Sequence, residues 1–281
     1  MEQILDRPEF QSAVIPFVVA MLVYAGLKKF TAGAWIWALF AAFLISSSLI
    51  NGTTLSPLTG TRKIILLVLG SLILAGLVPY LIRQLKLQRA VAPMLTILAL
   101  LWVFGKVVAR MDIIGIALFM AGGVGLVLWL AWTFDRIAND DSRLHGAGFT
   151  LMLGTGLSAT AAASALLGQL ALSLAAAAGG MLLAWVLLGK AVGSGRVSGS
   201  ISTLPYVLSA ALIGLAAIIF ARLPWYALIP LAAIPLATSL VPVKPDARFL
   251  SALVNSLPGF IIALAVAYWV WQAGSSNSSG Y

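Results

Sequence analysis

Long apolar stretches alternate with short polar connections along almost the whole chain. Most of them approach the roughly 20 apolar residues that a helix needs to cross a bilayer. Ten such segments stand out: residues 12–28, 33–50, 64–82, 91–109, 113–134, 147–167, 169–189, 203–221, 224–242 and 249–272. The pattern predicts an all-α polytopic transmembrane helix bundle of nine or ten spans with short loops.

The connections between these segments are too short to hold a soluble domain. The longest, FDRIANDDSRLHG, has 13 residues. We therefore expect residues 1–272 to form a single transmembrane domain. The first apolar segment is expected to stay as a span, because no basic signal-peptide start precedes it. Residues 273–281 are small, polar and uncharged, which predicts a flexible C-terminal tail.

Composition supports a membrane protein and removes several kinds of chemistry. Hydrophobic residues make up 62% of the 281 residues and charged residues 9%, against about a quarter charged in a typical soluble domain. The chain has no cysteine, which excludes disulfides, thiol catalysis and sulfur-ligated metals. We expect neither a cofactor nor a metal.

The formal net charge is +9, and the basic residues gather at the ends of the apolar segments. Basic residues at span ends set orientation, so we interpret them as topological and expect no nucleic-acid partner. Eleven lie in loops after odd-numbered segments: Lys28, Lys29, Arg83, Lys86, Arg89, Arg136, Arg143, Lys190, Arg196, Lys244 and Arg248. Six lie on the other side: Arg7, Arg62, Lys63, Lys106, Arg110 and Arg222. This excess predicts that the first group is cytoplasmic and both termini are outside. Short loops and the lack of targeting segments favour a bacterial inner (plasma) membrane.

The ninth segment is unusual because prolines interrupt it. Pro230 and Pro235 stand in its middle, about 140° apart around a helix, so they do not make one simple bend. Each removes a backbone donor and would leave a carbonyl unpaired, which is costly in hydrocarbon. Thr238 and Ser239 are expected to satisfy part of this deficit. The pattern predicts a broken span shielded from lipid, either a kinked helix that fits its neighbours or a discontinuous helix beside a substrate path.

Two further segments carry polar or small residues within the membrane. In the tenth, Asn255 and Ser256 precede Pro258 in mid-helix, which indicates either a hydrogen bond between helices or a polar ligand contact. The sixth and seventh segments are rich in glycine and alanine. Small residues let helix backbones approach closely, so we expect these two helices to be central and tightly packed.

Ionisable residues near the spans are few. Lys106 and Arg110 lie four residues apart, on one face of the fourth predicted helix. Their long side chains either reach the headgroup layer or attract an anion at the outer mouth of a path. No Asp or Glu falls at a predicted bilayer midplane, which argues against proton coupling through a buried carboxylate.

The single histidine offers little catalytic or metal chemistry. His145 falls beside Asp140 and Asp141 in a predicted cytoplasmic loop. These groups are too few for a metal site, so we expect a solvated loop. Polar residues elsewhere do not converge near one interface, and the sequence therefore does not predict an enzyme.

Two function hypotheses follow. The first is a small integral membrane transporter or channel-like carrier for a small or lipidic molecule, without an obvious proton-coupling carboxylate. Its predicted substrate path comprises Pro230, Pro235, Thr238, Ser239, Asn255 and Ser256, with Lys106 and Arg110 attracting anions at the outer mouth. The second is a non-catalytic membrane subunit that anchors or scaffolds a larger membrane protein complex. Membrane lipids are expected partners in both cases, together with a small-molecule or lipid substrate in the first and other membrane proteins in the second.

Overall fold

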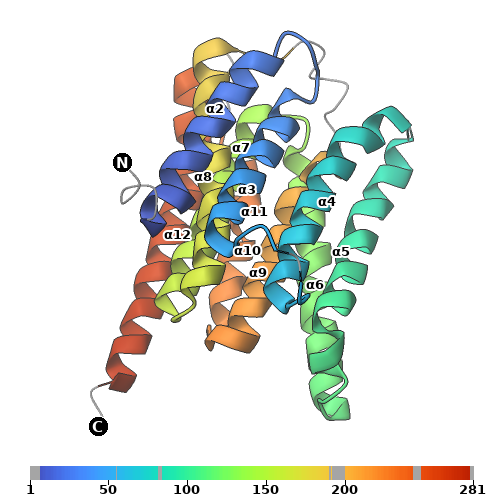
Figure 1. Ribbon diagram of the computed structural model, residues 1–281, viewed down its shortest axis with the longest axis vertical. Helices are drawn as coiled ribbons and strands as arrows, with labels where there is room; N and C mark the ends of the chain where they lie inside the picture. The colour runs from blue at the N-terminus through green and yellow to red at the C-terminus, as the bar shows by residue number, and fades with distance from the viewer. Residues whose placement is uncertain are drawn as a thin grey trace.

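The computed structural model describes residues 7–54, 56–81, 84–189, 191, 200–242 and 248–278. Within these ranges it contains helices and no strands, and Figure 1 shows the long helices packed side by side. Eight helices in the described part of the chain are long and apolar enough to cross a membrane. The predicted all-α, multi-pass membrane bundle is confirmed.

The elements follow the apolar segments in order. The long helices are α2 (Ile15–Leu27, continuing a π-helical turn η1, Phe10–Val14), α3 (Ala34–Asn51), α4 (Gly60–Leu81), α5 (Leu85–Val108), α6 (Ile113–Ile137), α7 (Asp141–Ala161), α8 (Ala165–Leu188), α9 (Leu204–Ala221) and α12 (Arg248–Ser278). The short ones are η3 (Ser200–Thr203), η4 (Trp225–Ala227), α10 (Leu228–Ala232) and α11 (Ile234–Ser239).

α7 lies inside the bundle although it is the least apolar of the long helices. Glycines keep it thin. A side chain at Gly148 would collide with Tyr206 of α9, and one at Gly154 would collide with Leu231 of α10. Because α7 and α8 bury most of their residues against neighbours, the prediction of a central, closely packed pair is confirmed.

The boundary between these two helices differs from the prediction. The apolar pattern divides them at Gly168, but Gly168 lies within α8. The turn is at Ala162–Ser164, where Ala163 has a φ of 69° and the Ser164 N–H donates to the Ala159 carbonyl at 2.9 Å. Glycine is the usual residue in this left-handed conformation, and alanine rarely adopts it. Because an alanine occupies the position here, the sequence gives no signal for the turn.

The ninth segment is a broken helix, as its prolines predict. Its elements η4, α10 and α11 cover only Trp225–Ser239 and are interrupted at Ala233. The interruption places Pro235 in the first turn of α11, where a helix needs no backbone donor. The break therefore accommodates a proline that a continuous helix would tolerate poorly.

Several helix ends meet at the top of Figure 1, which we call the upper end. There the Tyr24 hydroxyl of α2 donates to the Gly189 carbonyl after α8, at 2.9 Å. Arg89 at the start of α5 pairs with Asp135 near the end of α6, with Nε and Oδ2 3.1 Å apart. The residues in these contacts lie at or near the connections after the first, third, fifth and seventh predicted segments, which the distribution of basic residues assigns to one side of the membrane. Which side of the membrane this end faces remains a prediction.

The opposite, lower end carries the turn between α5 and α6 and the end of α12 (Figure 1). α12 continues to Ser278, beyond the end of the apolar pattern at residue 272. An existing helix extends easily, because each added residue gains one hydrogen bond for one residue ordered. Part of the segment predicted as a polar tail is therefore helical.

Candidate functional site

An apolar groove of about 890 Å³ lies between α6, α9 and the broken ninth span. None of the residues that line it carries a charged side chain. Rim residues such as Leu118 and Ile229 are exposed, which places the groove at the surface of the bundle. Its lining consists of Leu118, Phe119, Gly122, Gly123, Gly125, Leu126, Trp129, Leu215, Ile218, Trp225, Leu228, Ile229, Ala232 and Ala233.

Glycines on one face of α6 leave the space. Gly122, Gly125 and Trp129 recur at the three- and four-residue spacing of a single helix face. A side chain built at Gly122 or Gly125 would meet no atom within 4 Å. A Cβ atom at either position would therefore stand in open space on the groove side of α6.

The broken span forms one wall of the groove and is tied to α6. The Trp129 indole N–H donates to the Ala232 carbonyl at 3.0 Å. Ala232 ends α10, and the last carbonyls of a helix have no partner within it. The tryptophan thus satisfies a backbone group at the break, and it does so from inside the groove.

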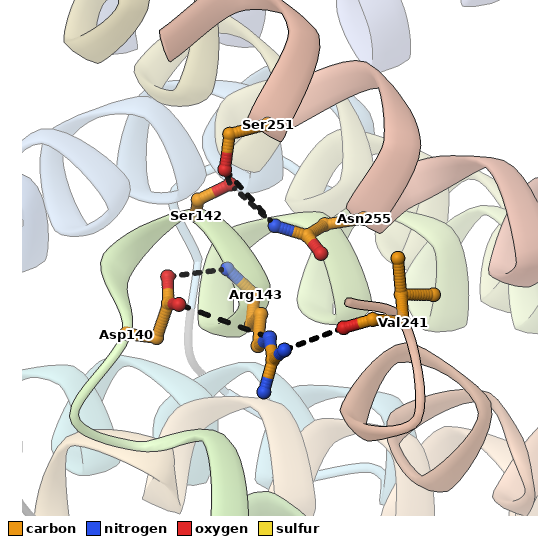
Figure 2. A network of polar contacts seen from close by, with 6 residues as sticks. All are labelled: Asp140, Ser142, Arg143, Val241, Ser251 and Asn255. Carbon is orange, nitrogen blue, oxygen red and sulfur yellow. Dashed lines mark hydrogen bonds and ion pairs between the residues drawn. The ribbon is translucent and has the colours of Figure 1, made fainter. Parts of the chain in front are cut away.

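A network of polar contacts, which we call the polar junction, lies near the starts of α7 and α12 (Figure 2). Asn255 of α12 donates through Nδ2 to Ser142 Oγ of α7 at 2.9 Å and to Ser251 Oγ at 3.2 Å. Nearby, Arg143 donates to the Val241 carbonyl just after α11 at 2.5 Å. The junction therefore joins α7, α11 and α12 where α7 and α12 begin.

Three oxygens near the junction are buried and have no hydrogen-bond partner among the residues that the structure describes: Thr238 Oγ1, Asn255 Oδ1 and Ser256 Oγ. Close packing holds them in place. A side chain at Gly146 of α7 would lie 2.8 Å from Ser256 Oγ. Unpaired polar atoms in a protein interior are uncommon.

The interpretation of His145 as part of a solvated loop is wrong. His145 lies in α7, is buried, and its Nδ1 is 3.2 Å from the Tyr206 hydroxyl of α9. Its ring also packs edge-on against Trp35, with centroids 4.7 Å apart. α7 begins earlier than the apolar pattern indicates, because Asp140 caps it by accepting from the Arg143 N–H at 3.2 Å. The capping residue Asp140, followed by the acid Asp141, was the available sequence signal.

The six predicted path residues fall into two groups. Pro230 and Pro235 belong to the broken span, where Pro235 is buried. Thr238 and Ser239 end α11, and Asn255 and Ser256 belong to α12, which contacts α11. Within the described ranges, none of the six lines the groove itself. The groove is formed by apolar residues that carry no functional signal in a sequence.

Lys106 and Arg110 lie at the lower end, and both are exposed. Phe104 of α5 faces the groove side, since its ring packs against Phe119 with centroids 5.7 Å apart. Lys106 follows two residues later, about 200° further round the helix. Its side chain therefore leaves α5 on the side away from the groove.

A scan against protein-family models finds no match for the chain. No curated protein matches it either.

Proposed function

We propose that this protein is a membrane carrier for a lipidic molecule whose apolar part occupies the groove between α6, α9 and α10. The observation that supports this most strongly is the groove itself. Its volume of about 890 Å³ lies within the range of small-molecule sites, about 300–1,000 Å³. Its lining is apolar, and its rim lies on helices suited to lipid contact. The groove is therefore suited to bind a hydrocarbon chain.

The broken span gives such a carrier two different surfaces. Its lower part, around Ile229 and Ala232, faces the groove. Its upper part carries Thr238 and Ser239 toward the polar junction, where Asn255 and Ser256 supply further polar groups. A path along this span would offer apolar surface to a chain in the groove and, at its upper end, polar atoms to a headgroup that is being moved. These four residues and the two prolines are the proposed path.

The first experiment fills the groove. Gly122→Leu and Gly125→Leu each place a branched side chain in open space, and leucine is a better helix former than glycine. The probe is hexadecanol carrying a diazirine near its methyl end, photolysed on the purified protein in phosphatidylcholine nanodiscs. We expect each variant to lose most of the labelling of α6 and α10 peptides. Gly70→Leu in α4, also in open space but outside the groove, is the matched control.

Movement is measured on the same variants in proteoliposomes that contain fluorescent NBD-phosphatidylcholine. Dithionite bleaches the outer leaflet only, so a carrier increases the fraction bleached. We expect this increase to disappear when the groove is filled, and to fall with Asn255→Leu combined with Thr238→Val. Unchanged labelling in both groove variants would rule out the groove as the binding site. A stoichiometric protein partner that covers α6 and α10 would instead support a complex subunit.

A further inference from the structure

Arg222 is the residue that caps the end of α9, close in the chain to two residues that line the groove. Ile218 of α9 lies four residues before it, and Trp225 of η4 lies three residues after it. Arg222 is therefore close to the lower end of the groove, although it is not among the lining residues.

The conformation of Arg222 is one that side chains rarely adopt. Its φ is 56°, in the left-handed region, and it ends α9 where the Leu223 N–H donates to the Ala217 carbonyl at 3.0 Å. Glycine is the usual residue at this position of a helix end. An arginine held here at a conformational cost suggests a use for its side chain.

The guanidinium of Arg222 is available to a ligand. The residue is exposed, and within the described part of the chain no hydrogen bond or ion pair involves its side chain. The nearby acid Asp112 is already engaged, because its Oδ1 accepts from the Gly115 N–H at 3.0 Å and caps α6. Lys106 and Arg110 add positive charge at the same end.

We infer that the groove takes an anionic amphiphile, with its hydrocarbon chain between α6 and α10 and its anionic headgroup on Arg222. The inference rests on the proposed function and specifies its substrate class. The apolar groove is complementary to the hydrocarbon chain of a lipid. The Arg222 guanidinium is complementary to a phosphate or carboxylate headgroup on that chain. A guanidinium suits such groups because it donates two parallel hydrogen bonds.

The test compares two probes with the same hydrocarbon chain and different headgroups, one neutral and one anionic. They are the diazirine-bearing hexadecanol and the corresponding hexadecyl phosphate, which is anionic at neutral pH, both in nanodiscs of zwitterionic phosphatidylcholine. We expect the native chain to be labelled several-fold more by the phosphate. Arg222→Gln should lower phosphate labelling about three- to fivefold, the range of an exposed charge pair, and leave hexadecanol labelling unchanged.

Lys106→Gln is the matched control, since it removes one positive charge at the same end but on the far side of α5. We expect it to change phosphate labelling by less than about twofold, because an exposed charge is largely screened beyond about 8–10 Å. Arg222→Lys should retain part of the preference. Arg222→Gly also removes the charge, and glycine adopts the left-handed conformation without steric cost. This variant therefore gives the same measurement if Arg222→Gln folds poorly.

Three results would overturn the inference: equal labelling by both probes, no effect of Arg222→Gln and Arg222→Gly, or an equal effect of Lys106→Gln. All three leave the proposed function standing if hexadecanol still labels the groove and Gly122→Leu still blocks it. Loss of groove labelling by hexadecanol in the native chain would instead contradict the proposed function.

Discussion

Single hydrogen bonds hold the broken span against its neighbours. The Trp129–Ala232 contact is the clearest, because it supplies a donor that the helix itself lacks at the break. Trp129→Phe keeps most of the ring volume but removes the indole N–H, leaving the carbonyl without this partner. We expect the free energy of unfolding to fall by about 1 kcal/mol, typical of one hydrogen bond.

The measurement is reversible unfolding by dodecyl sulfate in mixed micelles, followed by tryptophan fluorescence. Trp271→Phe on α12 is the control, since the Trp271 side chain is exposed and makes no hydrogen bond within the described part of the chain. Similar losses for both variants would show that the bond to Ala232 contributes little. Hydrogen bonds also help to hold Asn255 in the interior, because Ser142 Oγ and Ser251 Oγ both accept from its Nδ2.

At the scale of elements, backbone approach decides how helices pair. Gly179 and Gly180 are adjacent in α8 yet face different surroundings. A side chain at Gly180 would lie 2.2 Å from the Phe17 carbonyl of α2, whereas one at Gly179 would have its closest contact, with the Phe149 ring, at 3.4 Å. Gly180→Ala must therefore separate α2 from α8, while Gly179→Ala fits.

We expect Gly180→Ala to destabilise the protein by about 1–3 kcal/mol, the usual cost of overpacking. Gly179→Ala should be neutral or slightly stabilising, because alanine is the better helix former. Thermal unfolding in detergent measures both variants. Equal melting temperatures for the two would contradict the close contact between α2 and α8.

At the scale of the whole molecule, the distribution of basic residues predicts which end faces the cytoplasm. The chain has no cysteine, so single cysteines report position without background. Thr53 lies in the exposed loop after α3 at the lower end, and Asn139 in the exposed turn before α7 at the upper end. We expect a membrane-impermeant maleimide to label Thr53→Cys in intact cells, and Asn139→Cys only after permeabilisation. The reverse pattern would place both termini inside.

Much of the architecture was accessible from the sequence because it depends on local properties. Segment length and apolarity predict a bundle of helices that crosses the membrane several times, and Pro230 and Pro235 predict the broken ninth span. The small residues of α7 and α8 predict their close packing. The start of α7 was missed, since an apolar pattern alone does not include the capped, polar turn that contains His145.

The position of the groove depends on tertiary structure. Trp129 and Ala232 are 103 residues apart, and nothing local indicates that they meet. In a soluble protein, hydrophobicity distinguishes the buried face of a helix from the exposed one. In a membrane both faces are apolar, so the pattern along α6 or α9 does not reveal which side packs and which side faces lipid. Sequence alone therefore determined the class of protein and its broken span, whereas the fit of side chains between distant helices decided where an apolar groove opens.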